Sequence, residues 1–287
     1  MKTIQKILFP TDFSETATNA FRYCLRLADE YEATILLLHV IYPEYQVMDV
    51  PVMAMQATQD KQEAAEVLLQ SFVEATLVEA EAGAPIKKMP KVQTKVEIGE
   101  PVSVITSISR SENIDLIVMG TNADHSALEN FFGSITTGVV ERVHCPVWVV
   151  PEEAHYTQIE SAVYATDLKD DDPYHIWQAS QLLEPFHPLL HCVHVTNNGS
   201  DTPMNQENME QFFKTNAPTV SVNFHELSGK SVSEGLEEFS EVNQVDLIVM
   251  RAPQHTFLER IFYPSQTRKM ALHTRIPLLL YKEAAKD

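Results

Sequence analysis

The sequence contains little cysteine, glycine or positive charge. Its 287 residues include three cysteines and eight glycines, and 21 Lys and Arg stand against 40 Asp and Glu, a net charge of −19. Nucleic acids and anionic membranes are bound through clustered cations, so the charge balance argues against both as partners. An odd number of cysteines without a C-x-x-C pair fits a reducing compartment better than disulfide-linked secretion.

Long apolar runs are also lacking. No window approaches the ~18 apolar residues of a membrane-spanning helix, and the opening MKTIQKILFPTDFSE turns polar after a few apolar residues. Apolar residues make up 44% and charged residues 21% of the chain, which is an ordinary globular composition. The length predicts about two domains at roughly 150 residues each. We therefore expect a soluble, cytoplasmic, two-domain protein.

The two halves of the chain repeat each other. Three segments recur in order: ILFPTD at 7–12 returns as AVYATD at 162–167, LHV at 38–40 as VHV at 193–195, and DLIVM at 115–119 unchanged at 246–250. The offset falls from 155 (162 − 7) to 131 (246 − 115). The second copy therefore lacks most of a segment that the first carries from about Pro43 to Pro90. We place the boundary near Pro151, which gives domains 1–151 and 152–287.

Strand-like and helix-like segments alternate in the first copy. Continuous apolar runs predict buried parallel strands at 4–9, 35–41, 116–119 and 147–150, and alternation predicts a more exposed strand at 92–98. One helix is predicted to begin after Ser14 and another at Pro101. A further helix, which ends near Gly83, has its apolar positions at Ala65, Leu68, Leu69, Phe72 and Val73. This order predicts an α/β fold with two tandem doubly wound domains, each with a five-stranded parallel sheet.

Ligands of such sheets lie beyond the carboxyl ends of the strands, at the switch point. There the strand at 116–119 is followed by Gly120, and a helix begins at Gly133-Ser134. Glycine lets the backbone approach a ligand closely, and a helix start presents N–H groups to an anion. The alternative is structural, because glycine commonly ends strands and serine commonly caps helices.

The spacing Gly120-x2-Ala123-x9-Gly133-Ser134 resembles the G-x2-G-x9-G-[ST] nucleotide motif of the universal stress protein family. The resemblance extends to ILFPTD, LLHV, the GEP turn at 99–101, DLIVMGT and CPVWVV. The whole chain therefore resembles a tandem universal stress protein, whose fold is of the adenine-nucleotide α-hydrolase-like type.

This resemblance implies that the first half binds ATP, with or without Mg²⁺, or another adenine nucleotide, without a Walker lysine. By resemblance, Asp12 faces the ribose, the backbone around Val40 the adenine, and the glycine segment the phosphates. The candidate binding residues are Pro10, Thr11, Asp12, Val40, Met119, Gly120, Asn122, Ala123, Gly133, Ser134 and Ile135. Asp12 has a second interpretation, as a turn residue before the first helix, and the two roles are compatible.

Two departures from the motif bear on where nucleotide binds. Ala123 stands at the middle glycine, and its methyl group costs about 1 kcal/mol or more if the backbone there has positive φ. The second copy has Arg251, Gln254 and Pro264 at the three glycine positions. Proline lacks an N–H, and a lost hydrogen bond to phosphate costs roughly 1.5–3 kcal/mol. We expect nucleotide in the N-terminal domain only; binding of another anion by Arg251 stays open.

The sequence offers little for catalysis. No Lys or Arg lies between Gly120 and Ser134, and neither a P-loop nor an SGG-x-DS pyrophosphate loop is present. We therefore expect at most very slow ATP hydrolysis. The alternative function is a scaffold that binds a protein partner without nucleotide.

The crowding of His187, His191, Cys192 and His194 could indicate a metal site. Strand packing is the favoured interpretation, because His191 and His194 would point to opposite faces of the strand.

The last strands of the two copies, 147–150 and 278–281, could pair inside one chain. In the family that the sequence resembles, such strands commonly form a dimer edge. Covering an apolar strand edge also prevents aggregation. We therefore expect an intrachain pseudo-dimer; a homodimer of two chains and the identity of any protein partner stay open.

Overall fold

The computed structural model describes residues 4–43, 51–81, 86–121, 134–166, 172–196, 206–216, 221–228, 232–251 and 275–281. The chain divides into two compact units. The N-terminal unit holds the described residues of 4–121 and 134–147, and the C-terminal unit holds those of 148–281. The division falls inside the strand that ends the first repeat, whereas the sequence predicts a boundary near Pro151.

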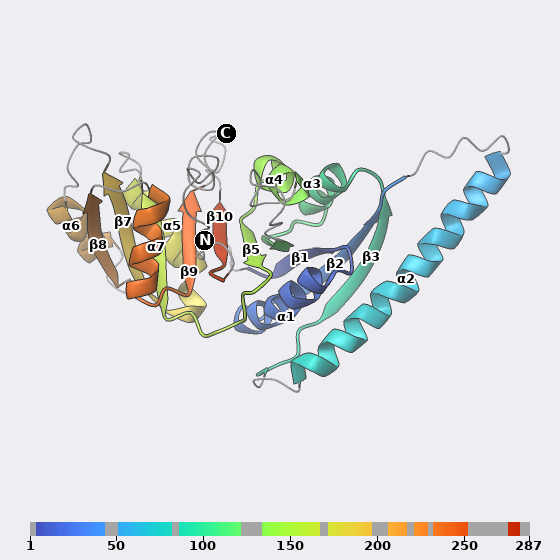
Figure 1. Ribbon diagram of the computed structural model, residues 1–287, viewed down its shortest axis with the longest axis horizontal. Helices are drawn as coiled ribbons and strands as arrows, with labels where there is room; N and C mark the ends of the chain where they lie inside the picture. Colours follow the sequence, from blue (N-terminus) through green and yellow to red (C-terminus); the bar gives the residue numbers. More distant parts are fainter. Residues whose placement is uncertain are drawn as a thin grey trace. The chain divides into compact units, whose positions relative to one another are not determined.

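The N-terminal unit is a parallel sheet with helices on its faces (Figure 1). Its elements are β1 (Lys6–Thr11), α1 (Glu15–Glu30), β2 (Thr34–Ile41), α2 (Pro51–Glu81), β3 (Val92–Ile98), α3 (Pro101–Ser111), β4 (Leu116–Thr121) and α4 (Ser134–Arg142). The strand order is β3-β2-β1-β4, and the pairs β1–β2, β2–β3 and β1–β4 are parallel. Ile7, Leu8 and Phe9 of β1 have no exposed surface, as expected for a strand covered on both faces.

Side-chain caps fix where two helices of this unit begin. The Ser14 hydroxyl accepts a hydrogen bond from the Ala17 N–H at 3.1 Å, so Ser14 caps α1 as the sequence predicts. The Glu100 carboxylate accepts from Val102 and Ser103 N–H groups at 3.0 and 2.8 Å, with Pro101 in the first turn of α3. Hydrogen bonds, first from Ser103, lower the pKa of Glu100.

The predicted insertion is the long helix α2, which spans 31 residues. The corresponding helix of the C-terminal unit, α6 (Gln206–Asn216), has 11. α2 contacts β3, β2 and α1. Leu69 and Thr76 are each 1% exposed on the packed side. The expectation that Leu68 belongs to the same buried side is wrong, because Leu68 is 56% exposed.

The C-terminal unit repeats this arrangement. Its elements are β5 (Val147–Pro151), β6 (Ser161–Thr166), α5 (Asp172–Leu182), η1 (Glu184–Phe186), β7 (Leu189–Thr196), α6, β8 (Val222–Ser228), α7 (Val232–Val242), β9 (Leu247–Arg251) and β10 (Leu278–Tyr281). The strand order is β5-β10-β9-β6-β7-β8. β5 and β10, the strands that end the two copies, are neighbours, as the sequence led us to expect.

The repeated DLIVM segment has the same structural role in both copies. The Asp115 carboxylate accepts hydrogen bonds from the N–H groups of Gln5 and Lys6, both at 3.0 Å, and so fixes the start of β1 beside β4. The Asp246 carboxylate accepts from Glu160 and Ser161 at 2.9 and 3.0 Å, at the start of β6. Each aspartate therefore joins the first and fourth strands of its own copy.

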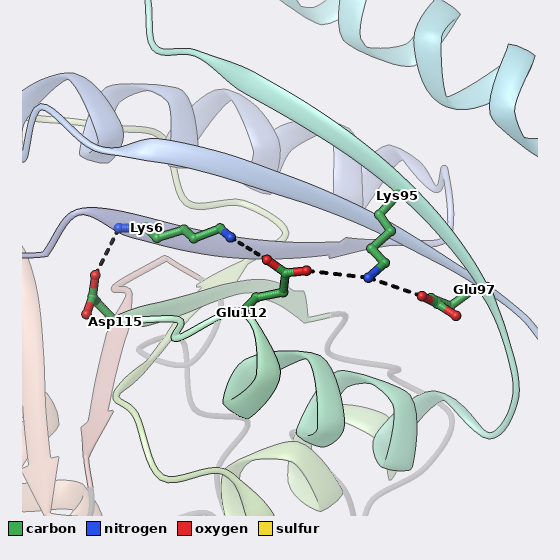
Figure 2. Close-up of polar contacts among 5 residues, drawn as sticks. All are labelled: Lys6, Lys95, Glu97, Glu112 and Asp115. Atoms are coloured by element: carbon green, nitrogen blue, oxygen red, sulfur yellow. Dashed lines mark hydrogen bonds and ion pairs between the residues drawn. The ribbon is translucent and has the colours of Figure 1, made fainter.

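A network of ion pairs ties α3 to the sheet of the N-terminal unit (Figure 2). The Lys6 Nζ lies 2.6 Å from a carboxylate oxygen of Glu112, just after α3. The Lys95 Nζ on β3 lies 3.5 Å from the other oxygen of Glu112 and 3.2 Å from Glu97. The hydrogen bond and charge of Lys6 lower the pKa of Glu112.

We predict that Glu112→Gln removes a pH-dependent part of the stability. Because the folded-state pKa of Glu112 is lowered, its contribution is complete above the ordinary value of 4.5 and is lost as the pH falls through the lower folded-state value. The pairs are partly exposed, so the loss at pH 7 should be about 1 kcal/mol or less. Thermal unfolding from pH 7 to 3 measures this difference, which should shrink toward zero at low pH. Glu66→Gln on the exposed side of α2 is the control; an equal effect in both variants would contradict the assignment.

Candidate functional site

The candidate site lies at the carboxyl end of β1, which is the switch point of the N-terminal sheet. β1 has β2 on one side and β4 on the other. The connection after β1 leads through α1 to β2, whereas the connection after β4 leads to α4. The two connections therefore leave the sheet in different directions, which in doubly wound sheets opens a crevice for a ligand.

The turn after β1 is held by its own side chains. The Thr11 hydroxyl accepts a hydrogen bond from the Phe13 N–H, and the Asp12 carboxylate accepts one from the Ser14 N–H, both at 3.0 Å. Phe13 has φ 65°, which is unusual for an aromatic residue. Asp12 is exposed while Pro10 is half-buried. The predicted turn role of Asp12 is therefore present, and its carboxylate is accessible to a ligand.

The end of β2 lies directly beside this turn. His39 is in register with Thr11, and its Nδ1 lies 2.9 Å from the Thr11 carbonyl oxygen, which can only accept, so Nδ1 carries the proton. The His39 ring is 4.5 Å from the ring of Phe13, which is 5.7 Å from Phe72 of α2. The next residue, Val40, is half-buried. The sequence pattern does not predict this contact, because Phe72 is far away along the chain.

β4 reaches the switch point at Gly120. β1 and β4 are registered at Leu8 and Ile117, so Thr11 and Gly120 each lie three residues farther along. Met119 is 6% exposed and packs in the core. A Cβ atom on Gly120 would lie 3.1 Å from the Thr16 carbonyl oxygen of α1, which is tighter than ordinary van der Waals contact. Glycine at this position therefore allows α1 to pack closely against the end of β4.

The helix expected to face the phosphates begins at Ser134. Ser134 is exposed and Ile135 is 43% exposed, so the first turn of α4 is open to solvent. Three predicted site residues, Asn122, Ala123 and Gly133, lie outside the described residues. The structure thus places Pro10, Thr11, Asp12, Val40, Met119 and Gly120 at the ends of adjacent strands, and Ser134 and Ile135 at the start of α4.

The C-terminal unit has the same strand register but a different residue at the switch point. His194 is in register with Thr166, and its Nδ1 lies 3.1 Å from the Thr166 carbonyl oxygen. Met250 is in register with Ala165, so Arg251 comes next to Thr166 and corresponds to Gly120. Arg251 is half-buried at the end of β9. Gln254 and Pro264 lie outside the described residues.

The histidines of β7 pack within the C-terminal unit. The His191 Nδ1 lies 3.0 Å from the His225 Nε2, and both rings contact Phe239 of α7. Desolvation lowers the pKa of both histidines. The described residues hold no group of three or more His, Cys, Asp or Glu placed to bind a metal ion. The His191 and His225 rings pack against each other and against Phe239.

The cysteines are free thiols in the interior. Cys24, Cys145 and Cys192 are buried and form no disulfide. Desolvation raises the pKa of Cys145 to about 12 and raises that of Cys24 as well, so these thiols are not poised as nucleophiles.

None of the helices that the structure describes is long and apolar enough to cross a bilayer.

The universal stress protein family model matches residues 3–151 and again 159–282. The chain belongs to the universal stress protein family. A universal stress protein of Methanocaldococcus jannaschii is 28% identical over 152 residues, which are 51% of this chain and 81% of that protein.

Solved universal stress proteins share the fold. A crystal structure from Archaeoglobus fulgidus has a TM-score of 0.70 at 18% identity and covers 98% of this chain and 99% of its own. A universal stress protein solved in complex with cAMP is 15% identical over 53% of this chain and all of its own, with a TM-score of 0.39. The two family matches together establish a tandem arrangement of universal stress protein domains.

We predict that Gly120→Val destabilises this universal stress protein. The added side chain meets the backbone of Thr16 and the Cβ of Ala20 at 3.1–3.2 Å, so α1 must move away from β4, at a cost of about 1–3 kcal/mol. Thermal unfolding measures the loss. Ile98→Val, at an exposed strand end, is the control and should change stability little. A Gly120→Val variant as stable as the parent would show that the approach of α1 does not require glycine.

Proposed function

We propose that the N-terminal unit binds an adenine nucleotide, ATP with or without Mg²⁺, and acts as a nucleotide-dependent sensor or signalling module. The observation that carries the proposal is the glycine motif combined with the fold. The motif begins at Gly120, at the end of β4, and ends at Ser134, at the exposed start of the nine-residue helix α4. N–H groups in the first turn of a helix are unpaired within the helix and bind anions.

The chemistry of the available donors fits a nucleotide. In this proposal the exposed Asp12 carboxylate accepts hydrogen bonds from ribose hydroxyls, and the backbone at Val40 contacts the adenine. Gly120, Ala123, Gly133 and Ser134 provide backbone N–H groups to the phosphates. Mg²⁺, when it accompanies ATP, neutralises phosphate charge in a chain whose net charge is −19.

We propose further that each chain has one nucleotide site. Arg251 occupies the position that corresponds to Gly120, where glycine allows close packing. Pro264 occupies the position that corresponds to Gly133, and proline has no backbone N–H to donate. The C-terminal unit then has a structural role, in which β10 covers the edge of β5 as the internal counterpart of a dimer contact. The buried free thiols support a cytoplasmic location.

The competing proposal is a scaffold in which neither unit retains nucleotide and the surface binds a protein partner. Ala123 favours it, because a methyl group stands where the family motif has glycine. The two proposals differ in whether the intact chain binds ATP, and in whether substitutions at the start of α4 change that binding.

We predict that Ser134→Pro weakens ATP binding by about ten- to 150-fold, because it removes one N–H that donates to a phosphate. Proline is compatible with the first residue of a helix, so α4 should remain folded. Ser134→Ala is the matched control, since it removes the hydroxyl but keeps the N–H, and should bind ATP more tightly than the proline variant. Titration of the full chain by calorimetry measures each affinity. Equal affinities for the two variants would contradict phosphate binding at this helix start.

We also predict that phosphate release from ATP is at background or far below the median enzyme rate of about 10 per second. The segment between Gly120 and Ser134 has no Lys or Arg to stabilise charge in a transition state. A phosphate-release assay with saturating ATP and Mg²⁺ measures the rate. Brisk, saturable turnover that Ser134→Pro abolishes would contradict a binding module and indicate an enzyme.

A further inference from the structure

The helix α2 has two apolar faces, of which the fold uses one. The buried face consists of Ala65, Leu69, Val73, Thr76 and Ala80, each at most 7% exposed. These positions recur every three or four residues and face the sheet and α1. The ion pair between Arg22 and Glu79, and the hydrogen bond from Arg26 to the Ala80 carbonyl oxygen at 3.0 Å, hold this face against α1.

The second face is apolar but exposed. Val67, Leu68 and Val78 are 66%, 56% and 69% exposed. With the exposed residues Ala64, Ser71 and Ala75 they form a continuous stripe at helical spacing, here called the α2 stripe. The stripe runs from Ala64 to Val78, and its 14 residue-to-residue steps span about 21 Å at 1.5 Å each. Figure 1 shows α2 beside β3, the edge strand of the N-terminal sheet.

One border of the α2 stripe is acidic. Glu63, Glu66 and Glu74 are exposed along it. Two of these carboxylates accept hydrogen bonds from neutral amides, Glu63 from Gln59 at 3.3 Å and Glu74 from Gln70 at 3.0 Å. These amides leave the negative charges in place.

The charges decide which partner can cover the stripe. In a symmetric antiparallel contact between two copies, the acidic border of one helix would lie beside the same border of the other. Each chain also carries a net charge of −19, so self-association brings like charges together. A helix with a leucine-like apolar stripe and flanking lysines or arginines instead pairs its cations with the acidic border while its apolar side covers Val67, Leu68 and Val78.

We propose that the α2 stripe is a docking surface for a cationic amphipathic helix of a partner protein. About four turns of partner helix match the stripe, with apolar anchors three and four residues apart. This contact is independent of the nucleotide site, because the stripe lies on the side of α2 opposite to its packed face.

The test uses the full chain and a synthetic 16-residue peptide with leucines at helical spacing and lysines at the other positions. A scrambled peptide of the same composition is the first control, because it keeps the charge but has no apolar face. Fluorescence anisotropy measures both affinities. We expect the amphipathic peptide to bind at least tenfold more tightly than the scrambled one.

The decisive variant is Val67→Ser, Leu68→Ser and Val78→Ser combined, which removes the apolar stripe without changing charge. We expect at least a tenfold loss of peptide affinity. Val242→Ser, at a 76% exposed valine of α7, is the matched control and should bind like the parent. Leu68→Gln alone is a second variant in case the triple one is unstable, with a loss of about threefold or more.

The acidic border is tested by replacing Glu63, Glu66 and Glu74 with glutamine, which should weaken binding and reduce its dependence on salt. Serine variants that bind the peptide as tightly as the parent would overturn the proposal, because net charge alone would then hold the peptide. A parent protein that is dimeric by light scattering and becomes monomeric in the serine variant would also overturn it, since a second copy would then cover the stripe.

Discussion

The position of β1 between β2 and β4 is the constraint on which the site depends. It makes the connections after β1 and β4 diverge, it aligns Thr11 with His39 of β2, and it places β4, which carries Gly120, on the other side. The glycine then allows α1 to lie close to the end of β4, where an added Cβ atom would be 3.1 Å from the Thr16 carbonyl oxygen. This packing fixes the strand ends that carry Asp12 and precede α4. The proposed nucleotide contacts of Asp12 and of the first turn of α4 depend on it.

The two copies share the hydrogen bonds that stabilise the fold and differ at the candidate ligand site. Asp115 and Asp246 make the same pair of backbone hydrogen bonds, and His39 and His194 make the same bond to a threonine carbonyl oxygen. The copies differ instead at the switch point, where Arg251 replaces a glycine. In our proposal, an arginine at that position removes the close backbone approach that a phosphate needs, while the shared hydrogen bonds keep the fold.

Local sequence patterns predicted the elements of the fold well, because each strand and helix has its own period. The Ser14 cap, Pro101 in the first turn of α3, and the start of α4 at Ser134 follow from residue types alone. Leu68 could not be assigned correctly, because its period fits both faces of α2 and only packing against β3 and α1 selects one. The contacts of Phe13 with His39 and Phe72 depend on a positive φ angle and on a distant helix, neither of which the sequence pattern indicates.

We propose that this chain holds one adenine nucleotide, at the switch point of its N-terminal unit. Equilibrium dialysis of the full chain against labelled ATP, at concentrations well above the dissociation constant, tests it most directly by counting bound molecules. We expect one ATP per chain, and none in a folded Gly120→Arg variant, which carries the residue found at the corresponding position of the second copy. Two bound molecules, or no binding by the parent chain, would contradict it.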